Sequence, residues 1–87
     1  MKELYISGLK QLLSAQLIQY RRTHGLSQAQ LAERLGIEPR SYIELEHGKS
    51  LCSTPVFLRF LLLCGDDPAG LLHEIRSCLD DVERSLR

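Results

Sequence analysis

Apolar residues recur along this chain at helical spacing. Near the N-terminus, Leu9, Leu13, Leu17 and Tyr20 are four, four and three residues apart, which places them on one face of a helix. No run of residues alternates between apolar and polar over the length of a strand. The pattern therefore predicts an all-α fold of five helices without a sheet.

Glycine, proline and helix-capping residues predict where these helices begin and end. The predicted helices run from about Ser7 to His24, from after Ser27 to Gly36, from Pro39 to before Gly48, from Ser53-Thr54-Pro55 to Cys64, and from Asp67-Pro68 to about Leu86. In the three middle helices the apolar residues expected to face inward are Leu31, Ala32, Leu35, Tyr42, Leu45, Phe57, Leu58, Leu61 and Leu62. Because the sequence contains no internal repeat and no linker, residues 1–87 form one predicted domain.

Two short predicted helices, separated by Gly36-Ile37-Glu38, carry the clearest functional pattern. A turn of about three or four residues that contains glycine and joins two short helices is typical of a helix-turn-helix unit, here at about residues 27–48. A helix with its side chains is about 10–12 Å across, and the major groove of B-DNA is about 12 Å wide. The second helix of such a pair can therefore enter the groove while the first crosses the DNA backbone.

An ordered set of residues surrounds this unit. Arg21 is followed by Gly25-Leu26-Ser27-Gln28, then by Leu31-Ala32 and Leu35-Gly36, and Glu46-His47-Gly48-Lys49 closes the second helix. With these residues in order and without gaps, the stretch LIQYRRTHGLSQAQLAERLGIEPRSYIELEHG resembles the Xre/Cro family of phage-repressor, lambda-repressor-like helix-turn-helix proteins. The resemblance spans roughly residues 9–72 and implies sequence-specific binding to double-stranded DNA.

The resemblance implies a role for each matching position. Gln28 would contact a phosphate at a helix N-terminus, where the helix dipole favours anions. It would also help to support the helix that begins at Pro39, the second of the pair. Arg21 and Glu46 would form a structural ion pair between the first and third helices. The positions that the resemblance implies for DNA contact are Gln28, Glu38, Pro39, Arg40, Ser41, Glu44, Lys49 and Ser50. Lys49 and Ser50 would grip the DNA backbone.

The base-facing positions depart from a typical DNA reader. Pro39 offers no long polar side chain, although its missing N–H costs nothing at a first helical position. Glu38 and Glu44 would be repelled by phosphates, yet a carboxylate can accept a hydrogen bond from cytosine N4. Arg40 is the clearest base reader, with guanine O6 and N7 as its bidentate acceptors. The residue types alone also fit solvent-exposed side chains without DNA contact at Arg40, Glu44 and Lys49. They equally fit a Gln28 that serves only the first turn of its own helix.

The last predicted helix, at about residues 67–86, provides a candidate dimerisation element. Its apolar residues step by three and four positions, which is the a/d spacing of a coiled-coil seam. The residues of this seam are Leu72, Ile75, Leu79, Val82 and Leu86. Because a dimer reads two half-sites, the sequence predicts a homodimer on an operator with two half-sites. The same stripe also fits a second interpretation, in which it covers the core of its own domain.

The charge balance limits how the protein could bind nucleic acid. The chain has 87 residues, of which 25% are charged, and its formal net charge is zero. Residues 1–49 contain seven basic and five acidic residues, whereas residues 50–87 contain four and six. Attraction for DNA is therefore expected in the first half of the chain. Neutrality, Pro39 and the two glutamates also suit an alternative function, a protein–protein interaction module such as an antitoxin or adaptor.

The sequence indicates no other class of function. Cys52, Cys64 and Cys78 are odd in number and widely spaced, which is typical of reduced thiols in a cytoplasmic protein. No apolar run approaches the roughly 20 residues that cross a bilayer. Neither a C-x-x-C pair nor a glycine-rich phosphate loop is present, so the sequence predicts no enzyme, no metal, no cofactor and no small-molecule ligand. The combined prediction is a small cytoplasmic transcriptional regulator, a repressor that acts by occupying a promoter.

Overall fold

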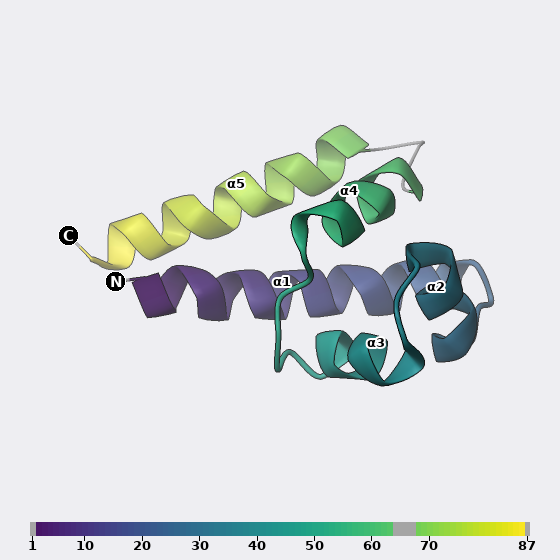
Figure 1. The fold of residues 1–87 in the computed structure, drawn as a ribbon. Helices are drawn as coiled ribbons and strands as arrows, with labels where there is room; N and C mark the ends of the chain where they lie inside the picture. Colours follow the sequence, from purple (N-terminus) through teal and green to yellow (C-terminus); the bar gives the residue numbers. More distant parts are fainter. Residues whose placement is uncertain (1, 64–67, 87) are drawn as a thin grey trace.

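Five α-helices build the fold (Figure 1). The computed structural model describes residues 2–63 and 68–86, and no strand occurs within these ranges. The helices are α1 (Lys2–Thr23), α2 (Gln28–Leu35), α3 (Pro39–Glu46), α4 (Thr54–Leu63) and α5 (Pro68–Ser85). The all-α prediction is confirmed, whereas the ends predicted at Cys64 and Asp67 lie outside the described residues. None of these helices is long and apolar enough to cross a membrane.

Local sequence signals define the pair of helices α2 and α3. Ser27 and Gln30 form a capping box, in which the Gln30 N–H donates to Ser27 Oγ at 3.1 Å and the Ser27 N–H donates to Gln30 Oε1 at 2.8 Å. Gly36 ends α2 in the left-handed region, with φ +74°, and Pro39 occupies the first turn of α3. The predicted boundaries of both helices are therefore confirmed.

Helix α1 begins at Lys2, several residues before the predicted start near Ser7. Ser7 and the Gly8 that follows it therefore lie inside the helix. A Cβ placed on Gly8 would stand 3.0 Å from Cys78 Sγ on α5. Gly8 thus marks a close approach of two helices, a feature that the sequence of α1 alone does not distinguish from a helix boundary.

Every helix contributes to a single core, whose buried apolar residues are Leu17, Leu31, Ala32, Leu35, Tyr42, Leu45, Phe60 and Leu71. All inward residues predicted for α2 and α3 are buried, so this part of the prediction is confirmed. In α4 the prediction is wrong for Leu58 and Leu62, which are 51% and 79% exposed, because the helix buries Phe60 instead. Helix α4 is apolar on nearly every side, so helical spacing could not identify its buried face.

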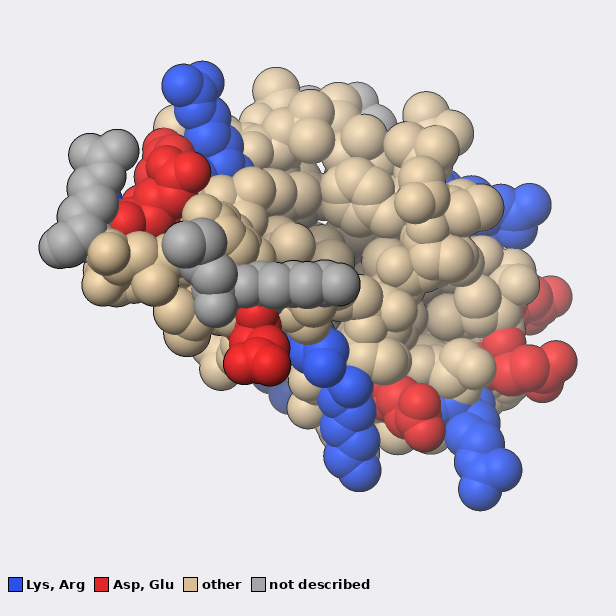
Figure 2. Space-filling view, turned by 60° about the vertical axis from the view of Figure 1, so that its left-hand side comes forward, with Lys and Arg blue, Asp and Glu red and all other residues tan. Residues whose placement is uncertain are grey.

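Helices α1 and α5 run side by side and antiparallel, and α3 lies on the opposite side of α1 from α5 (Figure 1). Helices α2, α3 and α4 gather around the C-terminal half of α1. Residues 2–12 of α1 and 75–85 of α5 therefore project as a two-helix arm, and the molecule measures 42 × 27 × 21 Å. Figure 2, which turns the arm toward the reader, shows a face whose middle is hollowed and formed mainly by uncharged side chains.

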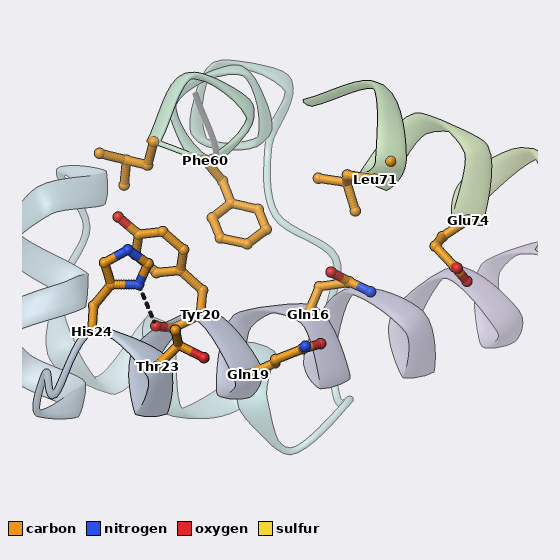
Figure 3. A pocket seen from close by; sticks show the side chains of 10 residues that line it. Gln16, Gln19, Tyr20, Thr23, His24, Phe60, Leu71 and Glu74 are labelled. Carbon is orange, nitrogen blue, oxygen red and sulfur yellow. Dashed lines mark hydrogen bonds between the residues drawn. The ribbon is translucent and has the colours of Figure 1, made fainter. Parts of the chain in front are cut away.

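An aromatic cluster attaches α4 to α1. The Tyr20 ring stacks on the His24 ring with centroids 4.0 Å apart, and it meets Phe60 of α4 edge-on at 5.7 Å. Such ring contacts contribute about 0.5–1.5 kcal/mol beyond their burial of area. Beside the cluster, α1, α4 and α5 line a cavity of about 410 Å³ that is open to solvent. Gln16 and Glu74 lie at the end of this cavity away from the rings (Figure 3). The cluster fixes α4 on α1, the helix against which α3 of the helix-turn-helix unit also packs.

Candidate nucleic-acid interface

Helix α3 divides cleanly into an exposed and a buried side. Its N-cap Glu38 and the next three residues, Pro39 to Ser41, are all exposed, and so is Glu44 one turn later. Tyr42, Leu45 and Glu46 point inward and are buried. The structure therefore brings the four predicted base-facing positions, Glu38, Pro39, Arg40 and Glu44, together with Ser41 on one exposed surface. A helix presented in this way has the geometry that helix-turn-helix proteins use to reach base edges.

The buried side of α3 is held by the carboxylate of Glu46, which accepts hydrogen bonds from three residues that, with Glu46 itself, we call the Glu46 cluster. Arg21 of α1 binds it with two nitrogens, Nε at 2.6 Å and Nη2 at 3.2 Å. Gln28 Nε2 of α2 donates to Oε1 at 3.1 Å, and the Tyr42 hydroxyl donates to Oε2. One buried carboxylate thus ties α1, α2 and α3 together. The Arg21–Glu46 pair is a structural contact that faces away from the exposed surface of α3.

The protonation states in this cluster follow from burial and hydrogen bonding. Burial alone would raise the pKa of the Glu46 carboxyl, but the hydrogen bonds from Arg21, Tyr42 and Gln28 outweigh it and hold the pKa below its ordinary value. The hydrogen bond to Glu46 raises the pKa of the Arg21 guanidinium. Burial, followed by the hydrogen bond to Glu46, raises the pKa of the Tyr42 phenol. The cluster is therefore a charged pair with a neutral phenol donor at neutral pH.

Gln28 lies in the first turn of α2 and is half-buried. One of its two amide protons is directed to Glu46, which is the supporting part of its predicted role. An amide nitrogen carries two protons, so the other remains able to donate elsewhere. The backbone N–H groups at the start of α2 adjoin it, and orphan N–H groups at a helix start favour anions.

The loop after α3 carries the other predicted backbone contacts. Gly48 adopts φ +70°, and its N–H donates to the Leu45 carbonyl at 3.1 Å, while the Lys49 N–H donates to the Glu44 carbonyl at 3.0 Å. These bonds end α3 and fix the direction of the loop. Lys49 is exposed and Ser50 is half-buried. Within residues 2–63 and 68–86, neither Lys49 nor Arg40 forms an ion pair with a carboxylate.

Two contacts of this region were not anticipated from the sequence. Ser14 Oγ of α1 donates a hydrogen bond to the backbone carbonyl of Glu46, which adds a second link between α1 and the end of α3. Tyr42 was expected only as an apolar core residue, yet its hydroxyl serves the Glu46 carboxylate. The four-residue spacing of Tyr42 and Glu46 on one helix face could have suggested the second contact. No sequence signal marks Ser14, because its partner is a backbone atom 32 residues away.

The predicted seam on α5 is divided between the inside and the outside of the molecule. Ile75 packs against the core, and Val82 lies against α1 near Gly8. Leu72 and Leu86 are 49% and 41% exposed, and Leu79 is half-buried. Ile75 and Val82 therefore serve the chain's own fold, while the residues one heptad apart, Leu72, Leu79 and Leu86, remain at the surface.

Comparison with known proteins agrees with this geometry. A family model described as a helix-turn-helix domain matches residues 12–73, which include α2, α3 and most of the core. No curated protein and no solved structure matches the chain. In the described part of the chain, no three His, Cys, Asp or Glu side chains are grouped as metal ligands. Since the matched residues make up more than half of the sequence, the chain belongs to the helix-turn-helix domain family.

Proposed function

We propose that this protein is a sequence-specific regulator of transcription of the Xre/Cro type, which binds double-stranded DNA as a homodimer. The observation that carries the proposal is the exposed first turn of α3, where Arg40 forms no ion pair within residues 2–63 and 68–86, while Glu46 anchors the opposite side of the helix. A rigidly held helix with a free polar face is suited to enter the major groove.

In the proposed complex, α3 lies in the major groove and Arg40 donates two hydrogen bonds to a guanine. A bidentate contact of this kind discriminates against the wrong base by about 1–3 kcal/mol. The start of α2, with Gln28, and the loop residues Lys49 and Ser50 bind phosphates on either side. Phosphate contacts set the position and register of the protein, whereas base contacts set its sequence preference.

Repression by occupancy is the simplest action of such a protein, because excluding another protein from a promoter requires only DNA binding. A second candidate function is favoured by one observation, the exposure of Glu38 and Glu44 beside Arg40 on α3. Two carboxylates on this surface would weaken attraction to phosphates, and they suit a basic protein partner instead. On that alternative, the chain is an antitoxin or adaptor with weak or no affinity for DNA.

Binding to DNA decides between the two functions. We would measure the affinity of the purified protein for a labelled duplex from upstream of its own gene and for a scrambled duplex of equal length, at about 150 mM salt. A regulator binds its site roughly 10³-fold or more tightly than the scrambled duplex. Equal and weak binding to both duplexes, together with binding to fragments from the rest of the genome that is no tighter, would favour the protein-interaction module.

Replacing Arg40 tests the base-reading role directly. Arg40→Ala is expected to weaken specific binding by about 1–3 kcal/mol and to relax the preference at one base pair. The matched control is Arg84→Ala, which removes an exposed arginine of α5 that pairs with Asp81 at 3.7 Å, far from α3. A loss of affinity that is equal for all sequences would assign Arg40 to a phosphate instead of a base.

A further inference from the structure

An apolar groove lies at the base of the arm. It is a hollow of about 320 Å³ between α1, α5 and the segment that leads into α4, and it is lined by Leu9, Leu13, Leu51, Cys52, Thr54, Phe57, Leu72 and Ile75. Two of its rim residues are among the most exposed leucines of the molecule, Leu51 at 37% and Leu72 at 49%. Apolar surface that is exposed and contiguous typically marks an interaction site.

The groove continues along α5 toward the tip of the arm. Leu72 and Leu79 are seven residues apart, so they lie on one side of α5, and Leu72 places that side at the groove. Leu86 follows at the same spacing, directly after the last residue of α5. At a rise of about 1.5 Å per residue, the three leucines are spaced about 10 Å apart. Together with the groove lining they form what we call the arm face. In Figure 1 no other described helix lies beside the tip of the arm, where α1 begins and α5 ends.

We propose that the arm face binds a second copy of this chain, with α5 antiparallel to α5 of that copy. The inference rests on the proposed function only in taking the protein to be a dimer. A two-fold interface must be complementary to itself, because the same patch is used on both copies. Centred on Leu79, an antiparallel pair places Leu86 of the second copy opposite Leu72, at the rim of the groove. The two arms then form a four-helix bundle, with α1 and α5 from each copy.

The charges beside the leucines fit this register. Arg76 and Glu83 are exposed on α5 and lie next to Leu72 and Leu79 on the helical wheel. Within residues 2–63 and 68–86, neither side chain forms an ion pair. Around a two-fold axis at Leu79, Arg76 of one copy comes to within about one residue rise, 1.5 Å along the helix, of Glu83 of the other. The pairing occurs twice, and two neutral chains meet without net repulsion.

The same two-fold axis orients the α3 helices of both copies toward one DNA molecule. In Figure 1 the helices α5, α1 and α3 follow one another in a row, and the segment between α3 and α4 crosses α1 on one side of that row. Leu51 and Cys52 of this segment line the groove, so the arm face lies on that side. An axis parallel to the row brings the arm faces together and leaves the α3 helices of both copies at the same end of the dimer. Two half-sites on one face of a duplex require this placement.

Sedimentation of the full-length protein tests the arm face. The wild-type chain is expected to form a dimer, and Leu72→Glu, which places a charge in the interface, is expected to raise the dimer Kd by about tenfold or more. The matched control is Leu4→Glu, since Leu4 has nearly the same exposure, 47%, and helical spacing places it on the opposite side of α1 from the groove residues Leu9 and Leu13. Helix content measured by circular dichroism shows that each variant is folded. A monomeric wild type, or a monomeric Leu4→Glu beside a dimeric Leu72→Glu, would overturn the proposal.

Charge reversal tests the register without depending on apolar packing. Arg76→Glu and Glu83→Arg are each expected to weaken the dimer by up to about tenfold, because like charges would then face one another. The double variant restores opposite charges and is expected to recover the wild-type Kd. Two weakened single variants without recovery in the double variant would exclude the antiparallel register.

These outcomes separate the interface from the proposed function. A wild-type dimer that Leu72→Glu disrupts, but that binds no DNA, supports the arm face and contradicts DNA binding. A wild-type protein that binds its site tightly and is monomeric both in solution and on the DNA contradicts the arm face and leaves the regulator intact.

Discussion

At the scale of single residues, the Glu46 carboxylate links three helices through side-chain hydrogen bonds. Glu46 is buried at 7% exposure, and its carboxylate accepts hydrogen bonds from side chains on α1, α2 and its own helix. A buried carboxylate is stable only when its oxygens are hydrogen-bonded, and here both oxygens have two donors. The orientation of α3 therefore depends on a charge.

Replacing Glu46 by a neutral residue is expected to lower the stability of the fold in a pH-dependent way. Glu46→Gln is expected to lower the free energy of unfolding by about 2 kcal/mol near pH 7, because charged hydrogen bonds are lost. In the wild type, the folded-state pKa of Glu46 lies below its ordinary value of 4.5, so the ionised carboxylate stabilises the fold. That stabilisation is complete above pH 4.5 and is lost as the pH falls through the folded-state pKa. Urea unfolding at several pH values measures the difference.

The exposed Glu44 of the same helix is the matched control for this measurement. Glu44→Gln is expected to leave stability within about 0.5 kcal/mol of the wild type at every pH. Should the two variants lose stability equally, or the Glu46→Gln deficit persist unchanged at low pH, the carboxylate would not be the anchor of α3.

The residues of the site differ in how far the sequence predicts them. The Arg21–Glu46 pair and the DNA-facing positions of α3 were both expected from a family resemblance. The hydrogen bond from Ser14 to a distant backbone carbonyl could not be predicted, because its acceptor has no side-chain signature. The link from Gln28 to Glu46 likewise depends on how α2 crosses α3, which only tertiary packing determines.

At the scale of elements, the turn between α2 and α3 sets the geometry of the helix-turn-helix unit. Gly36 adopts φ +74°, a conformation that a side chain at this position disfavours. The end of the Arg59 side chain of α4 lies directly over it, where a Cβ would stand. The turn is thus specified by backbone conformation and covered by a long, flexible side chain.

Two glycine substitutions separate these contributions. Gly36→Ala is expected to destabilise the fold by about 1–2 kcal/mol through backbone strain, with Arg59 moving aside. Gly25→Ala is the control, since Gly25 has φ +63° and no atom within 4 Å of an added Cβ. Thermal unfolding should therefore give similar losses for both variants. A much larger loss at Gly36 that Arg59→Ala relieves would show that Arg59 is held rigidly over the turn.

The element scale also shows where periodicity reaches its limit. The boundaries of α2 and α3 were predictable because capping residues act locally. The buried face of α4 was not, because a helix that is apolar all round gives no periodic contrast. On α5 the a/d stripe left two interpretations open, and the sequence could not tell that Ile75 packs against the core and Val82 against α1 while Leu72 and Leu86 stay exposed.

At the scale of the whole molecule, the zero net charge limits the electrostatic part of the proposed DNA binding. Eleven basic residues are balanced by eleven acidic ones, and Glu38 and Glu44 stand on the same surface as Arg40. Affinity gained from released counterions depends on the number of phosphates that are neutralised. With few basic groups on this surface, the proposed regulator would owe more of its affinity to base contacts and to the dimer than a strongly basic protein does.

The salt dependence of binding measures this directly. For B-DNA the slope of log K against log salt is about −0.9 for each neutralised phosphate, so we expect a shallow slope for the wild type. Lys49→Ala is expected to weaken binding to all sequences similarly and to reduce the slope by about one unit. Arg84→Ala, on the far end of α5, should leave both affinity and slope unchanged. An unchanged slope in Lys49→Ala would remove the loop after α3 from the set of phosphate contacts, and Gln28 with the N-terminus of α2 would then have to fix the register on DNA.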